Sequence, residues 1–132
     1  MLNTVNKCKG GDKVSWEFTS DKPIHIQLVN EISNRIIKGE YAPGMKLPSV
    51  RDFAAQASVN PNTMQRALSA LETGGLIFSE RTAGRFVTNN LELIRQAKEE
   101  LAKSNVENFF SSMAELGYSK DDAITMANEL KE

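Results

Sequence analysis

Residues 47–76 read LPSVRDFAAQASVNPNTMQRALSALETGGL, and this stretch decides the fold. Ser49, with an acidic residue three positions later, forms a capping-box pattern that starts a first short helix. After a short corner, Asn60 is a suitable N-cap, and Pro61 suits the first position of a second helix because its missing N–H would be unpaired there. The glycine pair at 74–75 ends that helix. At helical spacing, the residues predicted to be buried are Val50, Phe53, Ala54, Ala57, Met64, Ala67, Leu68 and Leu71.

Amide and guanidinium side chains line the opposite face of the second helix. Asn62, Gln65, Arg66 and Ser69 recur at intervals of three and four residues, which places them on one side of a helix. Asn and Gln can pair with adenine, and Arg can pair with guanine or hold a phosphate. The alternative is an ordinary solvated face, because polar stripes are the usual exposed side of amphipathic helices.

A β-hairpin is predicted directly after this helix, and we expect it to act as a wing. Its arms are residues 76–78 (LIF) and 86–88 (FVT), and residues 79–85 (SERTAGR) form a polar tip in which Gly84 allows a positive φ. Arg81 and Arg85 flank the tip and could contact the sugar-phosphate backbone or a minor groove. A solvated loop is the alternative interpretation.

The segment from Pro23 to Val87 resembles the winged-helix DNA-binding domain of the GntR family of bacterial transcription regulators. The residues that carry the resemblance are Pro23-Ile24-x-x-Gln27-Leu28, Ile37-x-Gly39, Pro43-Gly44-x-x-Leu47-Pro48-Ser49-x-Arg51, Asn60-x-x-Thr63, Ala67-Leu68-x-x-Leu71, Gly75-Leu76-Ile77 and Gly84-x-Phe86-Val87. Trp16-x-Phe18, the sequence of residues 60–63 (NPNT) and the short C-terminal tail resemble the YtrA-type branch.

The resemblance implies a repressor that contacts double-stranded DNA through three parts of the winged domain. These are the start of the helix that follows Ser49, the polar face of the helix that follows Asn60, and the wing. The predicted DNA-binding residues are Ser49, Arg51, Asn60, Asn62, Thr63, Gln65, Arg66, Arg81, Thr82, Gly84 and Arg85. Two positions depart from the family pattern. Pro61 stands where many members carry Arg, and the tip reads Thr82-Ala83-Gly84 in place of Gly-x-Gly.

Charge is unevenly distributed along this 132-residue chain, whose length supports one or two small domains. The whole sequence carries −1, but residues 41–90 carry +2 (five basic, three acidic) and residues 91–132 carry −4 (five basic, nine acidic). An excess of +2 attracts phosphates only weakly, so we expect DNA affinity to need two copies and ordered contacts.

The part before residue 47 adds few candidates for chemistry. Residues 1–14 are polar and we expect them to be flexible, while Trp16 is expected to pin the tail against the domain. A helix follows, with an apolar stripe every four residues from Ile24. His25 could sense a ligand or a metal, but no second His or Cys accompanies it, which favours a structural role. Cys8 has no partner for a disulfide.

Residues 90–132 are predicted to form a two-helix dimerisation module. The expected dimer contacts are Ile94, Leu101, Phe109, Phe110, Met113 and Leu116, in a helical rhythm that Asn105 interrupts. Two such helices cannot enclose a large core alone, so their apolar stripe needs a partner. A second subunit is the favoured partner because a two-fold dimer can place two recognition helices about one DNA turn apart. Packing onto the same chain, or a ligand pocket, are the alternatives.

The predicted architecture is mainly α with a small β-hairpin wing: a winged helix-turn-helix domain over residues 15–89, followed by the dimerisation module. No catalytic triad or paired-carboxylate arrangement is recognisable, so we expect neither an enzyme nor a cofactor or metal site. No apolar run suits a signal peptide or a membrane span, so we expect a cytoplasmic protein. The rival function is a winged-helix module for protein–protein contact without duplex binding. The sequence leaves open whether a small-molecule effector exists.

Overall fold

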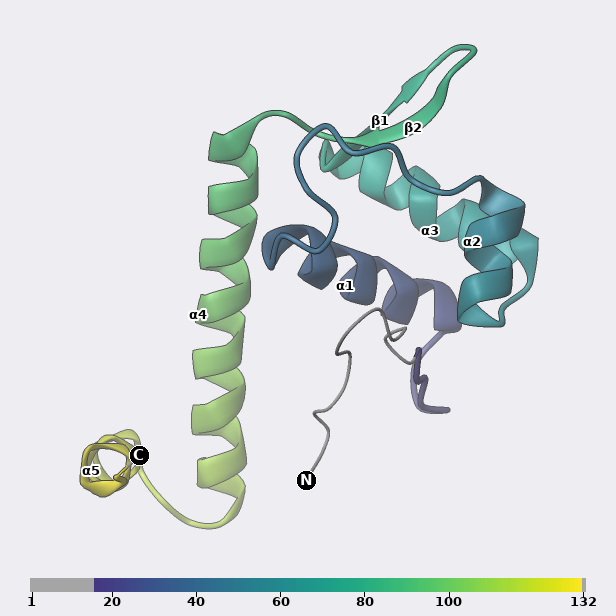
Figure 1. Ribbon diagram of the computed structural model, residues 1–132. Coiled ribbons are helices and arrows are strands. Elements are labelled where there is room, and N and C mark those ends of the chain that lie inside the picture. The colour runs from purple at the N-terminus through teal and green to yellow at the C-terminus, as the bar shows by residue number, and fades with distance from the viewer. Residues whose placement is uncertain (1–15, 132) are drawn as a thin grey trace. The chain divides into compact units, whose positions relative to one another are not determined.

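The computed structural model describes residues 16–131 and shows helices with one β-hairpin (Figure 1). The chain divides into two compact units, the first ending at Leu91 and the second beginning at Glu92. The predicted flexible tail, with Cys8, lies outside the described residues. Over residues 16–131, no helix combines the length and apolar character that crossing a membrane requires.

The first unit is a winged helix-turn-helix, as predicted. Its elements are α1 (Ile24–Ile37), α2 (Val50–Ala57), α3 (Pro61–Gly74), β1 (Ile77–Glu80) and β2 (Gly84–Val87). Helices α1 and α2 both pack against α3, and β1 also contacts α3. Helix α3 is therefore the central element, and its orientation fixes that of every other element in the unit.

Apolar side chains from all three helices and from the hairpin form the core of this unit. Phe53 of α2 is completely buried, and its ring meets Trp16 and Tyr41 edge-on, with centroid distances of 5.9 and 6.0 Å. Trp16 thus contacts the domain as predicted, whereas Val50, predicted to be buried, is only half-buried. The other buried apolar residues of the unit are Leu28, Ile32, Ile36, Leu47, Ala54, Ala57, Met64, Ala67, Leu68, Leu71, Leu76, Ile77 and Val87.

Left-handed backbone conformations end both helices of the helix-turn-helix. Ser58 caps α2 with φ 58°, and the next amide, that of Val59, donates to the Ala54 carbonyl at 3.0 Å. Gly75 caps α3 with φ 88°, a region that glycine enters at no steric cost. The chain therefore reverses sharply at each point, which keeps α2 and the hairpin close to α3.

The hairpin differs from its prediction at the tip. The antiparallel register pairs Ile77 with Val87, Phe78 with Phe86, Ser79 with Arg85 and Glu80 with Gly84. The turn therefore spans only residues 81–83, and the polar residues on either side of it, predicted to lie in the tip, belong to the strands. Gly84, predicted to lie in the tip, is the first residue of β2, and it has the predicted positive φ, at 108°.

A short segment before α2 pairs with β2 and widens the hairpin. The Leu47 amide donates to the Arg85 carbonyl, and the Val87 amide donates to the Met45 carbonyl, each at 2.9 Å. Lys46 forms an isolated antiparallel bridge with Phe86 between them. The start of α2 is therefore tied to the wing by backbone hydrogen bonds.

The second unit consists of α4 (Leu91–Glu115, which begins at the boundary residue) and α5 (Lys120–Glu129). Helix α4 continues through Asn105, where only the apolar rhythm breaks. A capping box between Ser119 and Asp122 starts α5. Among the described residues of this unit, Ala123 alone is fully buried.

Candidate nucleic-acid interface

Helix α3 carries the predicted polar face on its exposed side. Asn62, Gln65, Arg66 and Ser69 are all exposed, and Thr63 beside them is half-buried. The Gln65 side-chain amide donates to the Ser69 hydroxyl at 3.2 Å. The opposite side of α3 is fully packed, so this face presents amide and guanidinium groups from a rigidly held helix.

Two of the predicted DNA-binding residues have a structural duty at the helix starts. The Ser49 hydroxyl accepts from the Asp52 amide at 3.2 Å, and the Asn60 side-chain oxygen accepts from the Asn62 amide at 2.7 Å. Each bond satisfies a backbone N–H that the helix itself leaves unpaired. These side chains therefore fix where α2 and α3 begin, whatever they contact outside the protein.

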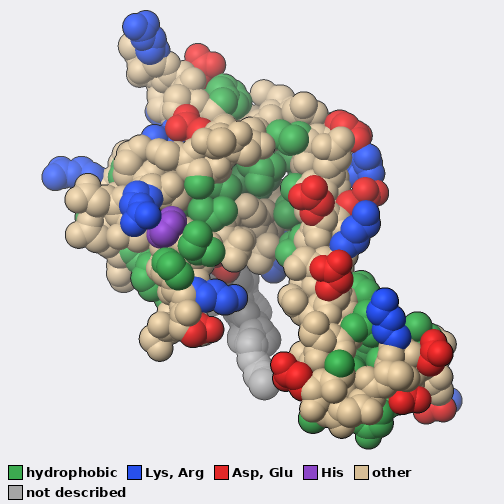
Figure 2. Space-filling view, turned by 180° about the vertical axis from the view of Figure 1, so that it is seen from behind, with side chains coloured by type: hydrophobic (Ala, Val, Ile, Leu, Met, Phe, Trp, Pro, Cys, Tyr) green, Lys and Arg blue, Asp and Glu red, His purple; other side chains and the backbone are tan. Residues whose placement is uncertain are grey.

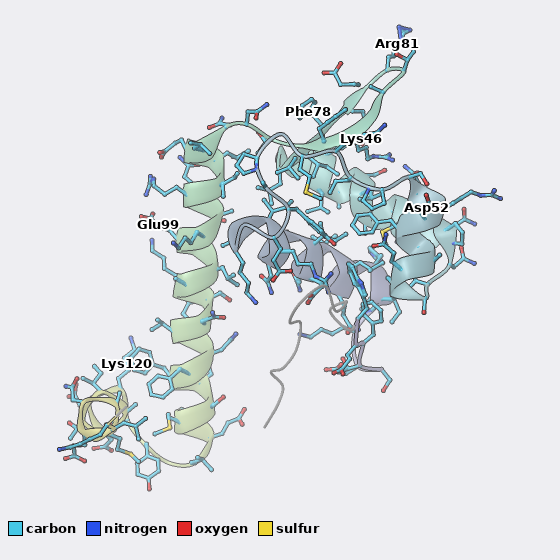
Figure 3. All side chains as sticks on the ribbon, viewed as in Figure 1. Lys46, Asp52, Phe78, Arg81, Glu99 and Lys120 are labelled. Atoms are coloured by element: carbon cyan, nitrogen blue, oxygen red, sulfur yellow. The ribbon has the colours of Figure 1, made fainter. Side chains whose placement is uncertain are left out.

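Basic residues line part of the space between the wing and α2, together with the acidic Asp52 and Glu80. A hollow of about 730 Å³ lies there, lined by residues 46–50, Asp52 and residues 79–85. Figure 3 shows Arg81 at the far end of the hairpin and Lys46 nearer its base. Arg81, Thr82 and Gly84 are exposed, and Arg51 is exposed in the first turn of α2.

Lys46 is a candidate that the sequence analysis missed. It is exposed, and its side-chain Cε lies 3.2 Å from the point where a Cβ on Gly84 would stand. Its signal in the sequence is its place between the apolar residues Met45 and Leu47, an alternation typical of a strand. A strand there places its lysine opposite Phe86 of β2, and the side chain reaches toward Gly84.

Arg85 lies differently from the other predicted cations. It belongs to β2, its side chain is only 20% exposed, and its Nε lies 3.6 Å from a carboxylate oxygen of Glu72 on α3. The Ser79 hydroxyl also hydrogen-bonds to Glu72. The structure therefore brings Arg85 to the junction of the wing and α3 and leaves Arg81 at the tip.

A buried arginine on α1, Arg35, is a second residue that the sequence analysis missed, and it stabilises the winged unit. Arg35 is 6% exposed, bonds Glu31 at 2.8 Å and the Tyr41 hydroxyl at 3.4 Å, and stacks its guanidinium 3.8 Å from the centre of the Trp16 ring. Burial lowers the pKa of Arg35, but the hydrogen bonds to Glu31 and Tyr41 outweigh it, so the pKa lies above its ordinary value. Arg35 therefore stays charged and holds the segment before α1 in place.

Metal-ligand clusters are not part of this arrangement. Over residues 16–131, no group of three or more His, Cys, Asp or Glu side chains is placed to hold a metal ion. His25 is half-buried at the second position of α1.

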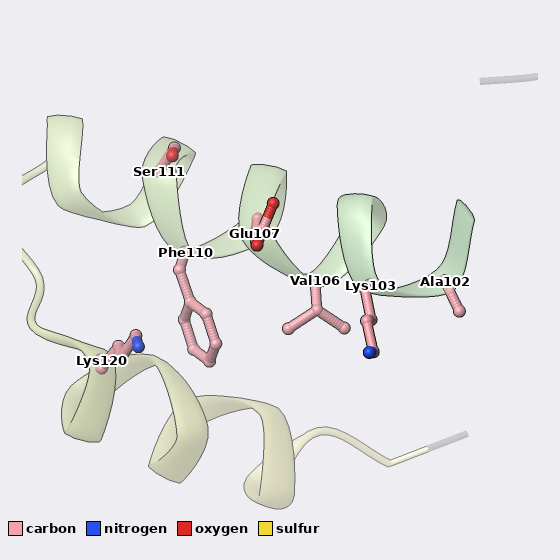
Figure 4. Close-up of a pocket in the computed structure, with 7 residues that line it drawn as sticks. All are labelled: Ala102, Lys103, Val106, Glu107, Phe110, Ser111 and Lys120. Carbon is pink, nitrogen blue, oxygen red and sulfur yellow. The ribbon is translucent and has the colours of Figure 1, made fainter. Parts of the chain in front are cut away.

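The predicted dimer contacts lie on α4 and just beyond its end, in the second unit. Leu116 is 72% and Phe109 40% exposed, and the other four, Ile94, Leu101, Phe110 and Met113, are half-buried. A groove of about 590 Å³ separates α4 from α5, with Val106 and Phe110 on its apolar wall and Lys103 and Lys120 among its lining residues (Figure 4). Figure 2 shows hydrophobic side chains at the surface of this unit beside acidic ones.

Comparison with known proteins places this geometry in a family. The sequence profile described as "Bacterial regulatory proteins, gntR family" matches residues 26–87. A solved structure, "GntR family transcriptional regulator from Listeria monocytogenes", is 38% identical with a TM-score of 0.77, over 86% of this chain and 100% of that one. The chain belongs to the GntR family.

Individual members of the GntR family support this assignment. The "Uncharacterized HTH-type transcriptional regulator YhcF" of Bacillus subtilis (strain 168) is 39% identical over 108 residues, 82% of this chain and 89% of that protein. The "HTH-type transcriptional repressor YtrA" of the same organism is 38% identical over 71 residues, about half of each protein (54% and 55%). The predicted resemblance to the family and its YtrA-type branch is thereby confirmed. A structure of "AraR(DBD) in complex with operator ORX1" is 28% identical with a TM-score of 0.52, over 58% of this chain and 100% of that one.

The two departures from the GntR pattern lie at exposed positions of the winged unit. Pro61 occupies the first position of α3 and has no N–H to offer. Thr82 and Ala83 lie in the turn of residues 81–83, and Gly84 is the first residue of β2. In this GntR-family member, position 61 therefore offers no long side chain at the start of α3, and the exposed arginine of the wing, Arg81, lies in the turn.

The hydrogen bond from the Asn62 amide to the Asn60 side chain predicts that Asn60 stabilises the fold. Asn60→Ala removes the cap of α3 and is expected to lower the free energy of unfolding by about 1 kcal/mol. Asn62→Ala, on the exposed face, is the matched control and is expected to change stability by less than about 0.5 kcal/mol. Urea unfolding followed by circular dichroism measures both, and equal stability of the two variants would contradict the capping role.

Proposed function

We propose that this GntR-family regulator binds a specific double-stranded operator as a homodimer and represses transcription from it. The observation that carries the proposal is the exposed amide-and-arginine face of α3 beside a basic wing. An α-helix fits the major groove of B-DNA, where each base pair presents a distinct pattern of donors and acceptors. The structure of AraR bound to an operator supports this, because that domain shares the winged fold.

Within this proposal the exposed residues divide by chemistry. Asn62, Gln65 and Arg66 read base edges, since amides match adenine and a guanidinium matches guanine. Arg51 and Arg81, from α2 and the wing turn, hold phosphates on either side. The remaining predicted contacts of this surface are Ser49, Asn60, Thr63, Thr82 and Gly84, whose small groups allow close approach of the backbone.

The exposed apolar residues of the second unit support the homodimer. Within the described part of the second unit, residues 92–131, seven large hydrophobic side chains are at least 40% exposed: Val106, Phe109, Leu116, Tyr118, Ile124, Met126 and Leu130. Exposed apolar surface of this kind marks an interaction site, and aromatic residues and Met are enriched in interfaces. A two-fold dimer also doubles the weak basic excess of the winged unit and sets two recognition helices on one duplex.

We infer repression and a cytoplasmic location from relatives of the same family. YtrA, which is described as a repressor, is 38% identical to this chain over 71 residues. A regulator of this kind works in the bacterial cytoplasm, where the chromosome lies. An operator-bound dimer represses by occupying the DNA that RNA polymerase needs.

Selection from a random duplex library tests the proposed function directly. Repeated capture on the purified full chain is expected to enrich two related half-sites in inverted orientation, about one helical turn apart, because a dimer mirrors its two-fold symmetry onto DNA. Sequencing the captured duplexes reads both the motif and its spacing. Failure to retain any duplex at low ionic strength would instead favour a winged-helix module that docks on protein.

A single variant tests the reading of bases by α3. Arg66→Ala is expected to weaken binding to the selected duplex by roughly 1–3 kcal/mol if the guanidinium contacts a base. The same variant should bind a scrambled duplex almost as well as the wild type does. Lys38→Ala, at the exposed C-cap of α1, removes the same charge outside the proposed surface and serves as the control. Equal weakening on both duplexes would assign Arg66 to a phosphate.

A second pair of variants tests the dimer. Phe109→Glu combined with Met113→Glu is expected to give monomers, because two like charges on each copy would face one another in an apolar interface. Ser104→Glu is the control, since it stands about 140° and 180° around α4 from those two positions. Sedimentation velocity measures the outcome, and operator affinity should fall with the dimer. An unchanged sedimentation coefficient for the double variant would rule out this interface.

A further inference from the structure

Three side chains connect helix α3 to both strands of the wing. Glu72, in the last turn of α3, accepts a hydrogen bond from the Ser79 hydroxyl on β1, and its other carboxylate oxygen lies 3.6 Å from Arg85 Nε on β2. Ser79 and Arg85 are cross-strand partners in the hairpin register. We call Glu72, Ser79 and Arg85 the wing clamp.

The period of the strands explains why Arg85 turns toward α3. Side chains alternate between the two faces of a strand, so Ser79 shares a face with Ile77, and Arg85 shares a face with Val87. Ile77 and Val87 are buried in the core of the unit, 1% and 0% exposed. The wing clamp therefore continues the inward face of the hairpin, on the side of α3.

The surroundings of Arg85 oppose a contact with DNA. Its side chain is 20% exposed and that of Glu72 27%, and Arg85 Nε is buried with no hydrogen-bond partner in the described part of the chain. Moving the guanidinium outward to a phosphate would break the ion pair. It would also leave the half-buried Glu72 carboxylate without its cation, with the Ser79 hydroxyl as its remaining partner in the wing clamp, beside a negatively charged duplex.

We propose that Glu72 is a positioning residue that sets the angle between α3 and the wing, and that Arg85 serves this clamp and does not contact phosphate. The inference rests on the proposed binding of DNA. It leaves Arg81 and Lys46 as the cations of the wing that meet the backbone, because both are exposed. It also revises the role that the sequence assigned to Arg85.

A fixed wing is important for DNA affinity because the overall electrostatic attraction between the winged unit and DNA is weak. The central region carries an excess of only +2, so affinity depends on contacts that form without further ordering of the protein. A hairpin of two four-residue strands is marginal on its own, and the wing clamp anchors it beyond the last buried pair, Ile77 and Val87. The clamp thereby lowers the conformational entropy that binding would otherwise cost.

The experiment compares Glu72→Gln, Arg85→Gln and the double variant with wild type, and uses Glu80→Gln as the control. Glu80 lies on β1, one residue after Ser79 and on the opposite face, and it is exposed. Its replacement removes the same charge from the wing region without touching the clamp. Hydrogen exchange of the hairpin amides in the free full-length protein is the first measurement, with the amides of α1 as the internal check of folding.

Operator affinity over a series of salt concentrations is the second measurement. Glu72→Gln and Arg85→Gln are each expected to speed exchange in the hairpin and to weaken binding roughly three- to tenfold, and the double variant should bind no more weakly than the single variants because they break one unit. The dependence of log affinity on log salt should keep its wild-type slope, since no phosphate contact is lost. Glu80→Gln should leave hairpin exchange unchanged.

The results that would contradict the wing clamp differ from those that would contradict the proposed function. If Arg85 contacts a phosphate, Glu72→Gln frees it and tightens binding, while Arg85→Gln reduces the salt slope by about one. Either result, or unchanged exchange in the hairpin of Glu72→Gln, overturns the clamp. A wild-type chain that retains no duplex overturns the proposed function, and with it the role of the clamp in binding; this failure is recognisable because it appears before any substitution is made.

Discussion

The packing of α3 against α1 is the constraint on which the rest of the structure depends. Met64, Leu68 and Leu71 are buried on one side of α3. Because successive residues of a helix are turned by about 100°, fixing these three side chains inward fixes Gln65 and Arg66 outward. A rotation of α3 by one residue would bring the Gln65 amide into the core in place of Met64 and expose a buried apolar side chain, at a cost of several kcal/mol. The orientation of the candidate recognition face is therefore set by the core and does not depend on DNA.

The helix-turn-helix could be predicted because its boundaries are encoded locally. Ser49 and Asn60 cap helices through bonds to amides two or three residues away, and Gly75 ends α3 by its own backbone conformation. The position of Arg85 could not be predicted in this way. Its polar neighbours are typical of a loop, and the group that holds it, Glu72, belongs to the preceding helix.

Arg35 shows the same limit on the opposite side of the unit. Its pairing with Glu31, four residues earlier on one helix, is readable from spacing. Its burial depends on Trp16 and Tyr41, which precede and follow α1 and meet only in the folded chain. Spacing along a helix predicts which apolar residues face inward. A charged residue among them becomes acceptable only through partners that lie outside the helix.

In the proposed regulator, the winged unit contacts DNA and the second unit associates with another copy of the chain. The winged unit closes a core of its own, whereas the described part of the second unit buries only Ala123 and exposes apolar side chains along both helices. A surface of this kind is stabilised by association, because apolar area removed from water contributes about 25 cal/mol per Å². The net charge of −4 over residues 91–132 disfavours contact between that segment and a duplex. Association through the acidic unit and DNA contact through the basic one can then proceed on one chain without competing for the same surface.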